Sequence, residues 1–202
     1  SSYPKYEAYE MAVGKRKFVG DLQFKGMLHS ALKFSDHPRA IVKSIDTTKA
    51  LELKGVINIF TAKDIPGERF IGLIVKDWPL MIGIGETTHY IGDVIAGVVA
   101  ENEEIARQAV SLINVEYEVL SPVTDPLEAL KPTAAQVHKN QPNLLETCRV
   151  YRGGDADKII TGSAFVASGK YQTQRIEHAF LEAEGAVALP EEDGVHLYAN
   201  GQ

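Results

Sequence analysis

The sequence has a single cysteine, Cys148, and this scarcity excludes several kinds of site. One thiol cannot form a disulfide within the chain, and it cannot supply the four thiolates that iron–sulfur clusters typically use. A cysteine-rich zinc site is excluded for the same reason. No signature of a nucleophilic cysteine surrounds Cys148, whose nearest histidine in sequence is His138. We therefore interpret Cys148 as a structural thiol.

The sequence also lacks long apolar runs and an excess of positive charge. No stretch approaches the roughly 18 apolar residues that predict a membrane-spanning helix, and residues 1–17 lack the apolar core of a signal peptide. Lysine and arginine number 21 against 27 acidic residues, which gives a net charge of −6. Because nucleic-acid binding proteins usually carry the opposite balance, we expect a cytoplasmic protein with neither a nucleic acid nor a membrane as partner.

The composition is that of a globular protein, with 45% apolar and 24% charged residues in a chain of 202. A polar arm, residues 1–15, comes first, and alternating segments that predict an α+β fold follow it. Strands are predicted at residues 27–34, 40–45 and 56–60, with a short helix before Gly55. Residues 68–86 contain three glycines and one proline, which indicates a long loop or a small hairpin.

The clearest local prediction is a strand, a helix and a second strand in residues 94–119. Residues 94–100 form a continuous apolar run, which is typical of a strand buried on both faces. Asn102 is a good N-cap for the helix that follows, and Glu103 and Glu104 suit its first turn. Residues 115–119 alternate like a half-exposed strand.

After residue 120 the pattern becomes less regular. A short helix is predicted from Pro126 to about Leu130, followed by a linker with two prolines at 131–143. Further segments are one or two helical turns at 155–161, strands at 165–172, 184–189 and 195–198, and a hairpin turn at 190–194.

Two glycines, Gly83 and Gly85, invite a comparison with phosphate-binding loops. A dinucleotide fingerprint needs a third glycine three residues further on, between a strand and a helix. Thr88 occupies that position, and no helix is predicted directly after it. We interpret the segment as a flexible loop.

The remaining candidates for chemistry are side chains of the last third of the sequence. His178 and Glu182 are four residues apart and could share one face, but no matching cluster of histidine or cysteine occurs elsewhere. His89 and His196 are isolated in sequence, so we interpret the histidines as packed residues, and we expect no metal ligand in the chain. The acidic residues 191–193 could be read as acid–base groups, but we expect them to solvate a turn.

The order of several short motifs resembles the molybdenum hydroxylases, the family of xanthine dehydrogenase and aldehyde oxidase. The motifs cover nearly the whole chain in the family's order: Phe18-Val-Gly-Asp21, Gly26-Met-Leu-His-Ser-Ala-Leu32, Ser35-x-His37-Pro-Arg-Ala40, Thr61-Ala-Lys-Asp64-Ile-Pro-Gly67, Tyr90-Ile-Gly92-Asp93, Val115-x-Tyr117-Glu118, Gln174-x-x-x-His178 and Gly201-Gln202.

This resemblance implies a fold and a division into domains. Residues 16–125 resemble the family's a/b hammerhead domain, which follows the N-terminal arm at 1–15. Residues 126–160 would be a linker with short helices, and residues 161–202 would be the truncated start of the β-rich molybdenum-cofactor-binding domain. The resemblance therefore implies a fragment of the molybdenum-binding subunit.

One site residue is implied by the resemblance. Tyr198-Ala-Asn-Gly-Gln202 matches a family segment whose glutamine donates a hydrogen bond to an oxo ligand of the molybdenum, so Gln202 would be the cofactor-binding residue. Many relatives have Ser-Thr where this chain has Asn-Gly. No catalytic residue is implied within the chain, and His178 and Glu182 match the family without receiving a role.

The resemblance also implies the reaction and the partners of the intact enzyme. The enzyme would hydroxylate an electrophilic carbon of a purine such as xanthine or hypoxanthine, with water as the source of oxygen. Its cofactors would be molybdenum–molybdopterin, with iron–sulfur clusters and FAD in other domains or subunits, and the parent enzyme would be a homo-oligomer. We expect the 202-residue chain alone to bind none of these cofactors and to be inactive.

Two alternatives stay open at this point. The first is an aldehyde oxidase or another subunit that hydroxylates aromatic heterocycles, because the same motifs occur in that branch. The second is a non-catalytic hammerhead module that contacts partner subunits.

Overall fold

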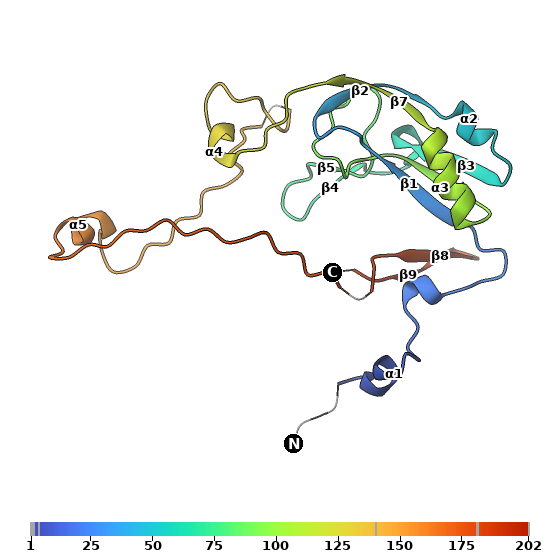
Figure 1. Ribbon diagram of the computed structural model, residues 1–202, viewed down its shortest axis with the longest axis horizontal. Helices are drawn as coiled ribbons and strands as arrows, with labels where there is room; N and C mark the ends of the chain where they lie inside the picture. Colours follow the sequence, from blue (N-terminus) through green and yellow to red (C-terminus); the bar gives the residue numbers. More distant parts are fainter. Residues whose placement is uncertain (1–2, 4, 140, 181, 202) are drawn as a thin grey trace. The chain divides into compact units, whose positions relative to one another are not determined.

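The computed structural model describes residues 3, 5–139, 141–180 and 182–201, and Figure 1 labels its helices and strands. The chain divides into two compact units. We call Met27–Val150 the sheet unit. The second unit, here the hairpin unit, combines Ser1–Gly26 with Tyr151–Gln202. Within the described ranges, no helix is long and apolar enough to cross a membrane.

The sheet unit is built on two small antiparallel sheets. In the first, β6 (Val94–Ala100) lies between β1 (His29–Phe34) and β3 (Val56–Thr61). In the second, β2 (Ala40–Asp46) pairs with β7 (Asn114–Val119). The continuous apolar sequence of β6 follows from its central position, because both of its faces and both of its edges are covered.

The helix α3 (Glu103–Leu112) packs against the first sheet. Its N-terminus is capped as predicted, because the Asn102 side chain accepts a hydrogen bond from the backbone N–H of Ile105 at 2.9 Å. The main core consists of small and β-branched residues of the sheet and of α3, together with Ala50 and the residue that follows α3: Ala50, Ile59, Ala96, Val98, Ala100, Ala106, Ala109 and Ile113. The alternate alanines of β6 and the alanines of α3 let the helix approach the sheet closely.

The strand, helix and strand predicted at 94–119 all form, but they do not make a unit of one sheet. β6 pairs with β1 and β3, whereas β7 pairs with β2 in the other sheet. A second core cluster of Val42, Ile82 and Ile95 forms beside them, with residues of β7 packed against it. The local pattern predicts each strand, but the choice of pairing partner depends on segments far away in the sequence.

Short elements complete the sheet unit. They are α2 (Thr48–Leu51), η2 (Ala62–Asp64), the predicted small hairpin of β4 (Phe70–Ile71) and β5 (Trp78–Pro79), and α4 (Pro126–Ala129). Gly55 follows α2 with a φ of +93°, and a Cβ there would lie 2.7 Å from Cδ1 of Ile105. This position therefore requires glycine, for its backbone conformation and for the approach of α3.

The hairpin unit has little regular structure. Its elements are α1 (Ala8–Ala12), η1 (Val19–Asp21), α5 (Ala156–Thr161) and the antiparallel hairpin of β8 (Ala186–Glu191) and β9 (Gly194–Ala199). The predicted hairpin and its turn are confirmed. The helix α1 lies within the segment that the sequence indicates only as a polar arm.

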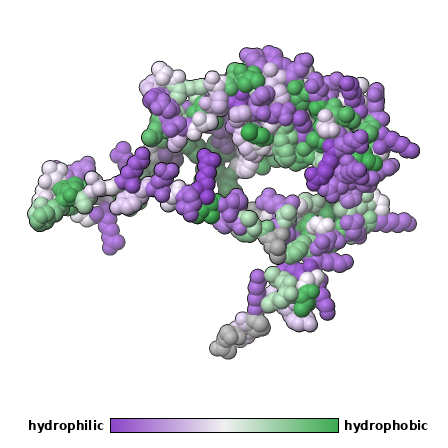
Figure 2. Space-filling model, viewed as in Figure 1, coloured by the Kyte–Doolittle hydropathy of each residue, from purple (hydrophilic) through white to green (hydrophobic). Residues whose placement is uncertain are grey.

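The strand predicted at residues 165–172 is wrong. The described residues between α5 and β8 contain neither helix nor strand, and apolar residues such as Phe165 and Tyr171 are exposed. In Figure 2, the apolar side chains of α5 form a green patch on the surface of this part of the chain. A strand requires a partner for its backbone N–H and C=O groups, and this segment has no partner in the described part of the chain.

Candidate functional site

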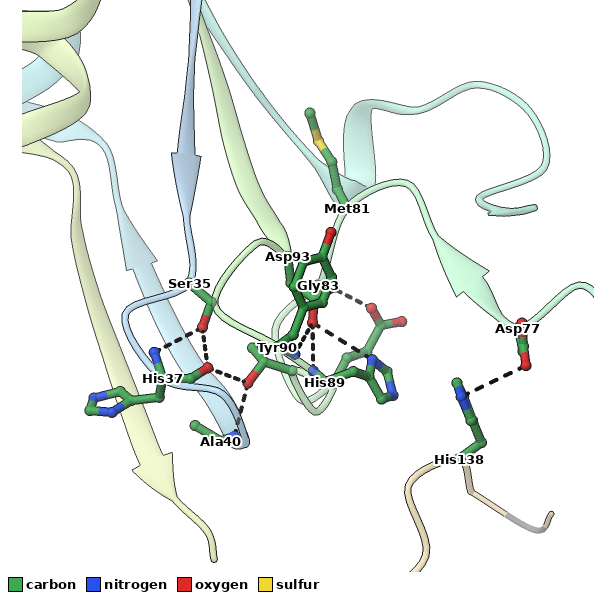
Figure 3. Close-up of polar contacts among 12 residues, drawn as sticks. Ser35, His37, Ala40, Asp77, Met81, Gly83, His89, Tyr90, Asp93 and His138 are labelled. Carbon is green, nitrogen blue, oxygen red and sulfur yellow. Dashed lines mark hydrogen bonds and ion pairs between the residues drawn. The ribbon is translucent and has the colours of Figure 1, made fainter. Parts of the chain in front are cut away.

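A buried carboxylate organises the loop that leads into β6 (Figure 3). Asp93 is only 3% exposed. Its Oδ2 accepts hydrogen bonds from the backbone N–H groups of His89, at 2.5 Å, and Tyr90, at 3.3 Å. The backbone N–H of Asp93 donates in turn to the carbonyl of Tyr90 at 3.2 Å. We call residues 89–93 the Asp93 turn.

The environment of Asp93 keeps its side chain ionised. Burial disfavours the charged form, but the neighbouring imidazole of His89 and the hydrogen bonds from the backbone N–H groups of His89 and Tyr90 outweigh burial and lower the pKa of Asp93. The imidazole Nδ1 of His89 lies 3.7 Å from Oδ2 of Asp93. A carboxylate with a lowered pKa is unsuited to act as a general acid near neutral pH, so its role is to hold the turn.

The side chains beneath the turn are also hydrogen-bonded. Thr88 Oγ1 accepts from the backbone N–H of Ala40 at 2.9 Å and donates to the carbonyl of His37 at 3.0 Å. Ser35 Oγ donates to the same carbonyl at 2.7 Å. These satisfied buried groups tie the start of β2 to the Asp93 turn.

Gly92 is required by a close approach in this turn. A Cβ at this position would lie 2.0 Å from Cε2 of the Tyr90 ring. The Gly92-Asp93 pair therefore has a physical basis: the glycine makes room for the tyrosine ring, and the aspartate accepts the backbone N–H groups.

The fold brings together two histidines that are far apart in sequence. The rings of His89 and His138 stack with their centroids 4.9 Å apart, and Nε2 of His138 lies 3.7 Å from Oδ2 of Asp77 (Figure 3). They border a groove of about 740 Å³ between the β4–β5 hairpin and residues 135–139. His89 looks isolated in the sequence, because nothing local indicates a partner so far along the chain.

The loop with Gly83 and Gly85 binds its own carboxylate. Glu86 accepts a hydrogen bond from the backbone N–H of Gly83 at 2.7 Å and forms an ion pair with Arg69. The hydrogen bond from Arg69 holds the pKa of Glu86 below its ordinary value. The N–H group that a phosphate would use is therefore already bonded to Glu86, which agrees with the interpretation as a loop.

The hairpin unit leads to the residue that the sequence implies for the cofactor. Gln202 itself lies outside the described residues. Two positions before it, Asn200 Oδ1 accepts from the backbone N–H of Gly185 at 2.7 Å, and Nδ2 donates to the carbonyl of Ala183 at 2.8 Å. The backbone N–H of Asn200 also donates to the carbonyl of Gly185 at 3.4 Å. We call these three hydrogen bonds the Asn200 clamp.

The pair His178 and Glu182 does not form a shared site. Oε1 of Glu182 accepts from the backbone N–H of Val19 at 3.1 Å, whereas the His178 ring stacks on Phe180 with a centroid distance of 5.4 Å. His178 is exposed, so the expectation of a packed histidine is wrong here, because the described segment before β8 has no partner that buries it.

The remaining side chains considered in the sequence lie on the surface. Glu192 and Asp193 form the exposed turn between β8 and β9, as expected, and Oε1 of Glu191 lies 3.3 Å from Nδ1 of His196. Cys148 is exposed, so the small-hydrophobe behaviour expected of a structural thiol does not apply to it.

The role that the sequence implies for Gln202 needs a hydrogen-bond donor and not a metal ligand. In the part of the chain that the structure describes, no group of three or more His, Cys, Asp or Glu residues could hold a metal ion. A glutamine amide such as that of Gln202 is a hydrogen-bond donor that does not titrate. Such a group can bond to a ligand of the metal without coordinating the metal.

Both halves of the chain match models of known protein families. Residues 13–121 match the model of the aldehyde oxidase and xanthine dehydrogenase a/b hammerhead domain, and residues 137–202 match that of the molybdopterin cofactor-binding domain. The chain is 37% identical over 190 residues to a probable xanthine dehydrogenase subunit of Bacillus subtilis, covering 94% of this chain and 25% of the relative. It is 28% identical to the nicotinate dehydrogenase large molybdopterin subunit of Eubacterium barkeri, covering 95% and 44%.

Solved structures give the same result. The aldehyde oxidoreductase of Desulfovibrio gigas is 27% identical, with a TM-score of 0.86 over 98% of this chain and 23% of its own. Quinoline 2-oxidoreductase of Pseudomonas putida 86 is 29% identical, with a TM-score of 0.81 over 98% and 26%. The chain thus spans less than half the length of each of these relatives. Its hammerhead domain, and the cofactor-binding segment that follows, show that the chain belongs to the aldehyde oxidase and xanthine dehydrogenase family of molybdenum hydroxylases.

Proposed function

We propose that this chain is part of the molybdenum-binding subunit of a hydroxylase that oxidises purines such as xanthine and hypoxanthine. The observation that carries the proposal is the 37% identity, over 94% of the chain, to a relative named as a probable xanthine dehydrogenase subunit. The segment Tyr198-Ala-Asn-Gly-Gln202 supports it, because it resembles the purine-oxidising branch of the family.

In this proposal the two units have different tasks. Molybdenum–molybdopterin, when bound, supplies the transfer of oxygen from water to the substrate carbon and the uptake of the electrons released. The sheet unit contributes a rigid support, and its buried carboxylate Asp93 fixes a turn. The hairpin unit carries Gln202, whose amide would donate a hydrogen bond to an oxo ligand of the cofactor.

The proposal extends to the partners and the location of the protein. The electrons would leave through iron–sulfur clusters and FAD in other domains or subunits, within a homo-oligomeric cytoplasmic enzyme. The names of the relatives support a division between subunits, since two of them are named as subunits of larger enzymes.

Aldehyde oxidation is the second candidate, and a specific observation favours it. The aldehyde oxidoreductase of D. gigas superposes on 98% of this chain with a TM-score of 0.86. Aldehydes and purines both present an electrophilic carbon, so substrate choice depends on the pocket around the reacting carbon and not on the hammerhead domain.

Steady-state kinetics of the intact protein that contains this chain would test the proposal. Xanthine, hypoxanthine and benzaldehyde would be compared with an artificial electron acceptor, after molybdenum content has been measured. We expect kcat/KM for a purine to exceed that for the aldehyde by about 100-fold or more, a difference of roughly 2.7 kcal/mol in transition-state stabilisation. Faster turnover of benzaldehyde would favour the aldehyde branch. Purified protein without molybdenum or turnover would favour the non-catalytic module.

A further inference from the structure

The last described residues of the chain are fastened by a single side chain. The Asn200 clamp joins the end of β9 to residues 183–185, just before β8 begins. It uses both the oxygen and the nitrogen of the Asn200 amide, at 2.7 and 2.8 Å. These hydrogen bonds therefore join the two sides of the hairpin at the end that lies opposite its turn.

Few residues could replace asparagine in this clamp. The acceptor of Asn200 faces an N–H group, and its donor faces a carbonyl oxygen. Aspartate keeps the acceptor but has no donor when ionised, and it would set a carboxylate oxygen against the Ala183 carbonyl. Alanine offers neither group. The clamp thus depends on the amide and not merely on a polar side chain.

The clamp rests on segments that are held by other contacts. The Glu182 carboxylate accepts the backbone N–H of Val19, which binds η1 to the residue next to Ala183. The ring of Phe24 stacks on that of Tyr198 in β9, with a centroid distance of 6.0 Å. Both sides of the hairpin entrance are thereby connected to residues 18–24.

The residue after the clamp contributes no constraint from its surroundings. A Cβ at Gly201 would meet no atom within 4 Å, so Asn200 is the last residue before position 202 whose side chain holds the chain in place. The Asn200 clamp therefore fixes the chain immediately before Gly201, two residues before position 202.

We propose that Asn200 is a positioning residue for Gln202: its amide fixes the end of β9 so that the glutamine two residues later reaches the cofactor in one orientation. This inference rests on the function proposed above for Gln202. It assigns a task to Asn200, the first residue of the Asn-Gly pair before Gln202.

A double-mutant cycle in the intact enzyme tests the inference. The variants are Asn200→Ala, Asn200→Asp, Gln202→Ala and the double variant Asn200→Ala/Gln202→Ala. We expect each single variant to lower kcat about tenfold, because a displaced amide no longer meets its acceptor. We expect the double variant to be no slower than Gln202→Ala alone, because two residues that act through one contact are not additive.

A matched control separates positioning from general stability. Asn143 makes a similar set of hydrogen bonds in the sheet unit: its Oδ1 accepts from the backbone N–H of Val137, and its Nδ2 donates to the carbonyls of Ala129 and Ala135. We expect Asn143→Ala to leave kcat within about twofold, because loss of a hydrogen bond alone affects stability and not turnover.

Two readouts do not depend on activity. In cofactor-free protein, Asn200→Ala should speed hydrogen–deuterium exchange of the peptide that contains Gly185, whereas Gln202→Ala should not. In loaded enzyme, Asn200→Ala and Gln202→Ala should change the electron paramagnetic resonance spectrum of the partly reduced molybdenum in the same way, with unchanged molybdenum content.

The outcomes are distinguishable. If Gln202→Ala slows the enzyme and both Asn200 variants do not, the inference is overturned and the role of Gln202 stands. If Gln202→Ala has no effect but Asn200→Ala slows turnover, Asn200 does not act through the glutamine, and the inference also fails. If neither changes turnover or the spectrum, the proposed role of Gln202 fails, and the positioning role fails with it. An additive double variant with reduced molybdenum content would show that Asn200 only stabilises the fold.

Discussion

The carboxylate of Asp93 accepts the backbone N–H of His89 at 2.5 Å, across a short turn. The bond connects the loop that leads away from Thr88 to the residue just before β6. Since β6 is the central strand of its sheet, the geometry of this turn determines how the strand enters the core. The carboxylate is therefore part of the framework that holds the sheet unit together.

Removal of the Asp93 side chain should destabilise the protein. In Asp93→Ala the partly buried N–H groups of His89 and Tyr90 lose their acceptor, and an unsatisfied donor that stays buried costs about 1–3 kcal/mol. We expect the free energy of unfolding to fall by about 2 kcal/mol, measured by urea denaturation. Asp36→Ala is the control, because Asp36 is exposed in its pair with Lys33, and it should change stability by about 0.5 kcal/mol or less. Equal effects of the two variants would contradict this role.

Stability should fall in acid because of the same carboxylate and Glu86. The pKa of each is lower in the folded protein than its ordinary value, so the folded state binds fewer protons than the unfolded state. The stabilisation is therefore complete above the unfolded pKa values, about 3.9 for Asp and about 4.3 for Glu, and is lost as the pH falls through the lower folded pKa values. Urea denaturation between about pH 2 and 7 should show a flatter acid limb for Asp93→Asn and Glu86→Gln. Parallel curves for wild type and both variants would refute the assignment.

Gly92→Ala should destabilise the protein mildly. Its Cβ would overlap the Tyr90 ring, and because that half-exposed ring must rotate away, we expect a cost of about 1 kcal/mol, the lower end of the range for overpacking. The control is Gly67→Ala, because Gly67 has open space around it and no positive φ, and this change should be neutral or stabilising by up to about 1 kcal/mol. Thermal unfolding of both variants provides the measurement. A wild-type melting temperature in Gly92→Ala would show that the ring moves aside without cost.

The cofactor-binding role implied for Gln202 leads to a further prediction. Gln202→Ala in the intact enzyme should reduce turnover about tenfold, or ~1.4 kcal/mol, which is less than loss of an oxyanion donor costs, because the oxo ligand is a spectator. Gln202→Glu should reduce it more, since a carboxylate would face an anionic centre. Molybdenum content should stay unchanged in both. Full activity of Gln202→Glu with full loading would place this residue away from the cofactor.

The domain boundaries are also a testable proposal. We propose that residues 16–125 fold as a hammerhead domain, with a linker at 126–160 and the start of the cofactor-binding domain at 161–202. A fragment of residues 16–125 should unfold cooperatively, as monitored by circular dichroism. Limited proteolysis of the whole chain should cut first at 163–180, which has no helix or strand among its described residues. Early cleavage within β6 or α3 would argue against the proposal.

Local chemistry made much of the fold predictable. The Asn102 cap, the Asp125-Pro126 start of α4 and the apolar run of β6 each form the element that they predict, because caps and hydrophobic patterns act within a few residues. The same reasoning failed at residues 165–172, where apolar residues are present but no partner strand accompanies them in the described ranges.

The candidate site was predicted only in part. The motif order indicated the family and Gln202, and the family is confirmed. The Asn200 clamp was missed, because the sequence shows a turn-like Asn-Gly pair and not its partners at Ala183 and Gly185. The nearest available signal was the spacing that a β8–β9 hairpin predicts, which brings residues 185 and 200 opposite one another.

The sequence by itself determined which segments become most of the strands and helices, which groups cap them, and which chemistry the single cysteine and the acidic composition exclude. Only the tertiary structure decided that β6 pairs with β1 and β3 while β7 pairs with β2. It also decided that His138 stacks on His89, and that Asn200 meets residues 183–185. The physical reason is the distance along the chain over which each interaction acts. Propensities, caps and turns act between neighbouring residues. Strand pairing and buried hydrogen bonds depend on residues far apart in sequence, which only the packed core brings together.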